Sequence, residues 1–141
     1  GQFIWKDGRK QDSFEAMLAT IVGGEIQYPP QRFRQPVQIR TEAFPWTPSG
    51  EGVNRKPLAR FNAAGPDLEL IQLAPGAVLA PSRSEQHRIF CVFSGEADCA
   101  GEALSESSYI YCPPGAELAK ISARTETVIF NARFEAGERR G

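Results

Sequence analysis

The 141-residue sequence contains a single histidine, His87, and no apolar run near the roughly 20 residues that a membrane-spanning helix needs. Its first ten residues, GQFIWKDGRK, lack the apolar segment of a secretory signal peptide. The 16 basic and 17 acidic side chains nearly cancel, so the chain has no overall positive field of the kind that nucleic-acid binding uses. These absences predict a cytoplasmic protein that binds neither a membrane nor nucleic acid.

Cysteine is also sparse. The three cysteines, Cys91, Cys99 and Cys112, form no C-x-x-C pair, and with His87 they fit no short zinc-ligand spacing. Reduced thiols are expected in a chain without an export signal. A Gly-rich phosphate loop, a nucleophile elbow and a paired-carboxylate signature are missing as well. We therefore expect no cofactor and no metal, and the sequence assigns no catalytic residue.

Residues 1–36 predict an N-terminal extension in three parts. The turn dipeptide Asp7-Gly8 favours a short hairpin, and Asp12 or Ser13 can cap the helix that follows. A Pro-containing stretch after the helix cannot be regular structure and suggests a strap. The parts are a hairpin at 2–11, a helix that stops at Gly23-Gly24 and a strap at 28–36.

From residue 37 onward, the hydrophobic pattern has a period of two. Short β-rich runs alternate with turn signals such as AAGPD, APGA, SGE and PPGA. The runs lie at 36–40, 52–61, 68–73, 87–94, 108–114, 117–122 and 127–134. Many short strands without helices between them predict an all-β sandwich or barrel over residues 37–141.

One spacing within these strands is specific. Gly76 is followed after five residues by Ser82-Arg83-Ser84, after three more by Arg88, and after six more by Gly95. This spacing resembles, gap for gap, the first motif of the cupin family. In that motif two histidines and a glutamate stand where this chain has Ser82, Ser84 and Arg88.

Two further stretches resemble cupins. The second cupin motif is similar to the pattern of Ser107, Pro113-Pro114-Gly115, Leu118 and Ser122, with Leu118 at the position of a third histidine. Upstream, residues 44–58 resemble the entry segment of the cupin-like domain in ChrR-type anti-sigma factors. The residues that carry this likeness are Trp46, Pro48, Gly52, Val53, Lys56 and Leu58. The resemblance covers about residues 37–134.

The resemblance implies a cupin double-stranded β-helix, or jelly roll, preceded by a short helical N-terminal extension. Cupins hold a divalent metal with three imidazoles and usually one carboxylate. The matching residues here are Ser82, Ser84, Arg88 and Leu118, and the permanent cation of Arg88 repels a metal ion. We therefore expect a cupin that lacks the usual metal site.

Alternation along a strand predicts which side chains face the cavity of such a barrel. The expected ligand-binding residues are Ser82, Ser84, Arg88, Phe90, Leu118 and Lys120, with Val92 on the same face. A buried arginine is costly unless something pairs with it. Arg88 can anchor a carboxylate or phosphate of a ligand in forked geometry. It can instead pair internally with Glu85, Glu117 or a backbone carbonyl, or lie at a barrel mouth wet enough to solvate its charged head.

Three functions remain open from the sequence. The first is binding or sensing of a small organic anion, such as a carboxylate, near Arg88. The second is a metal-independent isomerase or epimerase with His87 or Tyr109/Tyr111 as acid and base, although strand alternation places His87 away from the cavity. The third is a scaffold or regulatory domain whose barrel is filled with side chains.

The expected assembly is a homodimer. Jelly rolls leave sheet edges that must be covered, and cupins commonly cover them by dimerising through N-terminal segments. Residues 12–36 are the candidate segment here.

Overall fold

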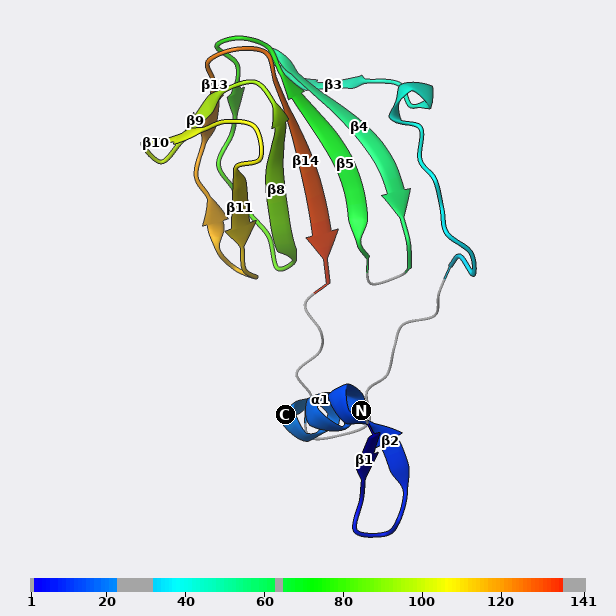
Figure 1. Ribbon diagram of the computed structural model, residues 1–141. Helices are drawn as coiled ribbons and strands as arrows, with labels where there is room; N and C mark the ends of the chain where they lie inside the picture. Colours follow the sequence, from blue (N-terminus) through cyan, green and yellow to red (C-terminus); the bar gives the residue numbers. More distant parts are fainter. Residues whose placement is uncertain (1, 23–31, 63–64, 136–141) are drawn as a thin grey trace. The chain divides into compact units, whose positions relative to one another are not determined.

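The computed structural model describes residues 2–22, 32–62 and 65–135. The chain divides into two compact units, one of residues 1–30 with 137–141 and one of residues 31–136. The first unit contains a hairpin and a helix, and the second is built from antiparallel strands (Figure 1). Among the described residues there is no helix with the length and apolar character to cross a membrane.

The N-terminal unit follows the predicted hairpin and helix. Strand β1 (Gln2–Ile4) pairs antiparallel with β2 (Lys10–Asp12), and helix α1 (Ser13–Val22) begins directly afterwards. Asp12 caps the helix, because its Oδ1 accepts a hydrogen bond from the backbone N–H of Phe14 at 2.9 Å. The predicted stop at Gly23-Gly24 and residues 28–31 of the predicted strap lie outside the described residues.

The second unit is a two-layered antiparallel structure (Figure 1). One layer has the strand order β11 (Tyr109–Cys112), β8 (His87–Ser94), β14 (Thr127–Phe134), β5 (Asp67–Leu73), β4 (Val53–Arg60) and β3 (Thr47–Gly50). The other has the order β10 (Glu102–Leu104), β9 (Ala97–Cys99), β13 (Ile121–Ala123) and β6 (Val78–Leu79), and β12 (Glu117–Leu118) pairs with β7 (Ser82–Arg83). Because the chain passes repeatedly from one layer to the other, the predicted all-β jelly roll is confirmed.

Two strand predictions need correction. Residues 36–40 form no strand, because the place beside β4 is taken by β3, and Val37 is exposed. The single run predicted at 117–122 is two short strands, β12 and β13, which pair with different partners. A short 3₁₀ helix, η1 (Thr41–Ala43), leads into β3.

The segment before β3 is fixed to the outer face of β4. Lys56 is buried there, and its Nζ lies 4.4 Å from the centre of the Trp46 ring and donates a hydrogen bond to the carbonyl oxygen of Thr41 at 3.0 Å. Trp46 and Lys56 both belong to the segment that resembles ChrR. Their contact is a cation–π interaction that holds the entry segment against the sheet.

The core lies between the two layers and changes character along the strands. Ile71, Leu73 and Ile129 are fully buried and pack with apolar residues of the opposite layer, such as Ile121 and Ala97. Further along these two strands, and along the neighbouring β8, polar side chains take the inward positions. These are Glu69 on β5, Asn131 on β14 and Arg88 on β8, all of them buried. The interior therefore has an apolar half and a polar half.

Gly95 ends β8 in a turn that only glycine fits. Its φ is +87°, and a Cβ atom placed on it would lie 2.1 Å from the backbone oxygen of Glu126. A methyl group would therefore meet both the left-handed backbone penalty and a backbone clash. The close approach of the two chain segments explains the glycine at the end of the first motif.

Candidate functional site

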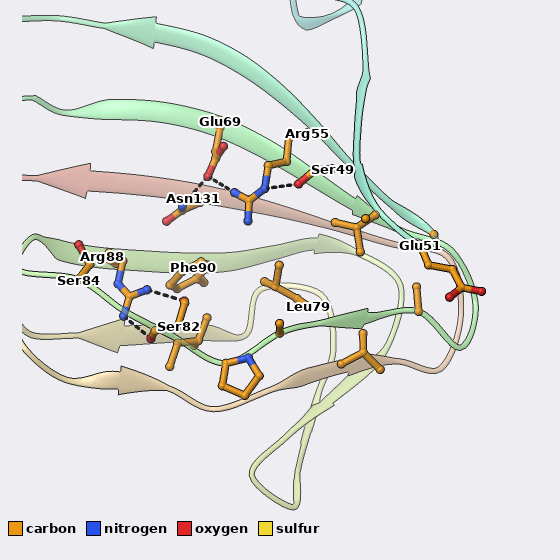
Figure 2. Close-up of a pocket in the computed structure, with 18 of the residues that line it drawn as sticks. Ser49, Glu51, Arg55, Glu69, Leu79, Ser82, Ser84, Arg88, Phe90 and Asn131 are labelled. Atoms are coloured by element: carbon orange, nitrogen blue, oxygen red, sulfur yellow. Dashed lines mark hydrogen bonds and ion pairs between the residues drawn. The ribbon is translucent and has the colours of Figure 1, made fainter.

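A cavity of about 990 Å³ opens beside the inner face of the six-stranded sheet. It is lined by the edge of β3 and β4 and by the segment that carries β6 and β7 (Figure 2). The charged side chains of its wall are Arg55, Arg83, Arg88, Arg133, Glu51 and Glu69. Four permanent cations against two carboxylates give the wall an excess of positive charge.

Arg88 is the most buried of these cations, with 4% of its surface exposed. Its Nη1 donates to the hydroxyl oxygen of Ser82 at 2.8 Å, and its Nη2 donates to the carbonyl oxygens of Ser82 and Ala116, both at 3.1 Å. Its Nε is buried and makes no hydrogen bond, and no carboxylate among residues 2–22, 32–62 and 65–135 forms an ion pair with it. The guanidinium is thus held by neutral oxygens while its charge stays unbalanced.

A second arginine stands opposite Arg88. Arg133 on β14 is its direct cross-strand partner in the antiparallel register, so both side chains lie on the same face of the sheet. Arg133 Nε is also buried without a hydrogen-bond partner, and its Nη2 lies 4.0 Å from Asp67. Arg60 already holds that carboxylate at 2.5 Å and 2.8 Å, and this contact lowers the pKa of Asp67. We call Arg88 and Arg133 the arginine pair.

A second polar group, the Glu69 cluster, comprises Arg55, Glu69 and Asn131. Glu69 Oε1 accepts hydrogen bonds from Arg55 Nη1 and Asn131 Nδ2, each at 2.8 Å. Arg55 Nε also donates to Ser49 Oγ at 3.1 Å. Figure 2 shows this cluster beside the group formed by Arg88 and Ser82.

The cavity brings together most of the residues that the sequence analysis selected. Ser82, Ser84, Arg88, Phe90 and Leu118 all line it. Lys120 does not, because residues 119 and 120 lie between β12 and β13 and break the alternation; its side chain is exposed. Val92 faces inward as expected but belongs to the apolar half of the interior. The internal partners of Arg88 are the Ser82 hydroxyl and two backbone carbonyls, whereas Glu117 lies 4.0 Å from Arg83.

The acid–base candidates lie on the opposite face of the sheet. His87 alternates with Arg88 along β8, and its Nδ1 is 2.7 Å from the hydroxyl of Tyr111. Tyr109 and Tyr111 are 74% and 52% exposed, and none of the three lines the cavity. Cys91 shares this outer face, while Cys112 is buried and lies opposite Arg88 in the register. Burial raises the pKa of the Cys112 thiol, and the charge of Arg88 partly offsets that rise.

The residues at the cupin metal positions do not fit a divalent ion. Arg88 occupies one of them with its own hydrogen bonds to Ser82 and Ala116, and a guanidinium donates rather than ligates. The described residues contain no group of three or more His, Cys, Asp or Glu side chains placed to share a metal. No chemistry that needs a metal is therefore derived for this cavity.

Comparison with known protein families identifies the family of this chain. The model of the ChrR cupin-like domain matches residues 34–136. The chain belongs to this cupin family. No curated protein matches the sequence.

Solved cupin structures share the fold. An RmlC-like cupin from Shewanella frigidimarina has a TM-score of 0.61 and 19% identity, over 77% of this chain and 96% of that one. KdgF from Halomonas sp. has a TM-score of 0.59 and 19% identity, over 73% and 97%. The structure of Rhodobacter sphaeroides SigE in complex with the anti-sigma ChrR has a TM-score of 0.57 and 14% identity, over 67% of this chain and 50% of that one. These likenesses establish the cupin fold.

Sequence reasoning did not select Arg55, Glu69, Asn131 or Arg133, although the cupin fold places all four in the cavity wall. The alternation of inward and outward side chains along the strands does indicate such residues. Asn131 and Arg133 share the strand face of buried Ile129, and Glu69 shares the face of buried Ile71. Polar residues at inward positions of otherwise apolar strands indicate a cavity, and these positions lie outside the two cupin motifs.

Proposed function

We propose that this cupin binds a small organic anion, a carboxylate or phosphate, in the cavity beside Arg88. The observation that carries the proposal is the arginine pair. Two arginines lie directly opposite each other on neighbouring strands, and both have a buried Nε that makes no hydrogen bond with any described residue. Like charges in directly opposed cross-strand positions destabilise a sheet, and a bound anion removes that repulsion.

The position of Arg88 further supports an anion site. Burying a cation without an opposite charge costs several kcal/mol unless the cation is paired or neutralised. Arg88 donates hydrogen bonds to three neutral oxygens, and no carboxylate in the described part of the chain forms an ion pair with it. An anion accepts charge-assisted, forked hydrogen bonds from arginine, and these are about twice as strong as neutral ones.

The other two functions have less support. The barrel contains an open cavity, which a packed scaffold does not need. The acid–base role that the sequence suggested depends on His87, Tyr109 or Tyr111, and all three lie outside the cavity. Binding or sensing therefore accounts best for the arginine pair.

The proposal is tested by thermal shift and isothermal titration calorimetry with acetate, butyrate, succinate, benzoate and inorganic phosphate. Wild type is compared with Arg88→Met, which keeps an unbranched apolar stem but removes the charge, and with Arg124→Met. The latter removes the same charge from an exposed ion pair with Asp98, outside the cavity. We expect at least one anion to bind wild type and Arg124→Met and to bind Arg88→Met at least tenfold more weakly. Anion binding that survives Arg88→Met, or no binding to wild type at 20 mM, refutes the proposal.

A further inference from the structure

The Glu69 cluster offers hydrogen-bond acceptors to the cavity, whereas the arginine pair offers hydrogen-bond donors. Both hydrogen bonds to Glu69 use Oε1, and Oε2 receives none from any residue that the structure describes. Asn131 Oδ1 is buried and has no hydrogen-bond partner, on a residue that is 3% exposed and lines the cavity. The cluster therefore has two acceptor oxygens without donors.

The orientation of Asn131 follows from its neighbour. A carboxylate only accepts hydrogen bonds, so the amide nitrogen must be the atom that faces Glu69. The carbonyl oxygen then has to point elsewhere, and a buried acceptor without a donor costs about 1–3 kcal/mol. Asn131 is 3% exposed, so its carbonyl oxygen without a donor lies inside the fold.

The acceptor and donor groups lie side by side. Asn131 is the cross-strand partner of Phe90, and Arg133 is the partner of Arg88, so the two groups are two residues apart along the same pair of strands. Two residues of an extended strand span about 7 Å. A molecule of a few carbon atoms reaches from one group to the other within a cavity of about 990 Å³.

We infer that the bound anion also carries a hydrogen-bond donor, a hydroxyl or an ammonium group, which Glu69 and Asn131 accept. The ligand class is thus a small hydroxy- or amino-carboxylate whose acid group meets the arginine pair. This inference rests on the proposed anion site and adds to it the recognition of the other end of the molecule. A neutral hydroxyl leaves the Glu69–Arg55 ion pair as it is, and an ammonium adds an opposite charge to Glu69.

The test compares matched ligands on the whole chain by isothermal titration calorimetry. Butyrate, pentanoate and hexanoate are measured against the same acids with a terminal hydroxyl or amino group. A hydrogen bond to a charged or otherwise unpaired buried group is worth roughly tenfold in affinity. We expect at least one hydroxy or amino acid to bind about tenfold more tightly than its unsubstituted partner.

A conservative variant identifies the residues responsible. Glu69→Gln keeps the side-chain size and an acceptor for Arg55 but turns one carboxylate oxygen into a donor. In this variant the preference for the substituted acid over its unsubstituted partner, with both acids measured on the variant itself, should fall below about threefold. Equal binding of matched acids to wild type, or a preference that survives Glu69→Gln, overturns the inference and leaves the anion site standing. If no carboxylate binds wild type, the anion site itself fails and this inference fails with it.

Discussion

Replacing Arg88 with methionine separates ligand recognition from stability. Methionine fills a similar volume and brings no polar atom into the core. The side chain would lose hydrogen bonds to Ser82 Oγ and to the carbonyls of Ser82 and Ala116. Ser82 is exposed, so water can replace the arginine at its oxygens.

The magnitude follows from opposing contributions at this one residue. Three hydrogen bonds from a charged donor contribute roughly 1.5–3 kcal/mol each. Two costs oppose these hydrogen bonds. Desolvation of a buried cation that has no carboxylate partner costs several kcal/mol, and the buried Nε without an acceptor costs about 1–3 kcal/mol. We expect Arg88→Met to change the free energy of unfolding by less than about 1.5 kcal/mol in either direction.

The assay is urea unfolding followed by circular dichroism and tryptophan fluorescence, with and without the anion that binds most tightly. An anion at a hundred times its Kd stabilises the wild type by about 2.7 kcal/mol and should leave Arg88→Met unchanged. Arg88→Ala serves as a control for volume, because the added void costs about 2 kcal/mol more than methionine does. A loss above about 3 kcal/mol for Arg88→Met would show that Arg88 is a structural clamp between β8, β7 and the Ala116 turn.

Three further predictions concern the rest of the molecule. Gly95→Ala should lower the free energy of unfolding by about 2 kcal/mol or more. Gly76 also has a positive φ but open space around its Cβ position, so Gly76→Ala should lower it by only about 1 kcal/mol. Equal losses of the two variants in urea unfolding would reject the clash at Gly95. Arg60 lowers the pKa of Asp67 below its usual value near 3.9, so this carboxylate stabilises the fold above about pH 4 and loses that contribution as pH falls through the lowered value. Asp67→Asn should therefore show a smaller fall in Tm between pH 6 and pH 3 than wild type, and an unchanged fall would contradict this. The full chain should sediment as a homodimer, because β3 and β11 are edges of the six-stranded sheet; a monomer at 0.1 mM would reject this.

The fold was predictable from the sequence because period-two alternation and turn residues recur from residue 52 to residue 134. Gly76, Gly95 and Gly115 have positive φ in the structure, which explains why glycine stands at these motif positions. Very short strands such as β6 and β7 have two residues each and carry too little pattern to detect. Residues 36–40 alternate like a strand, but strand pairing depends on a neighbour, and the sequence does not show which neighbour is available.

The candidate site was predictable only on the segments that the two motifs cover. Arg88 and Phe90 line the cavity as expected, because strand alternation fixes the face, and Leu118 lines it at the position that the second motif indicates. Lys120 was not, because the alternation stops between β12 and β13. Arg133 was missed because its importance comes from standing opposite Arg88, and a cross-strand register between residues 45 positions apart in the sequence is visible only in the fold.

The division of the interior into an apolar and a polar half has a consequence for the exchange of backbone hydrogens with solvent. Amides beside Ile71, Leu73 and Ile129 are enclosed by side chains from both layers and should exchange only when the whole unit unfolds. Amides of the same strands beside the cavity, near Glu69 and Asn131, should open locally and exchange faster. A bound ligand would slow the second group directly, so one strand reports occupancy at one end and global stability at the other.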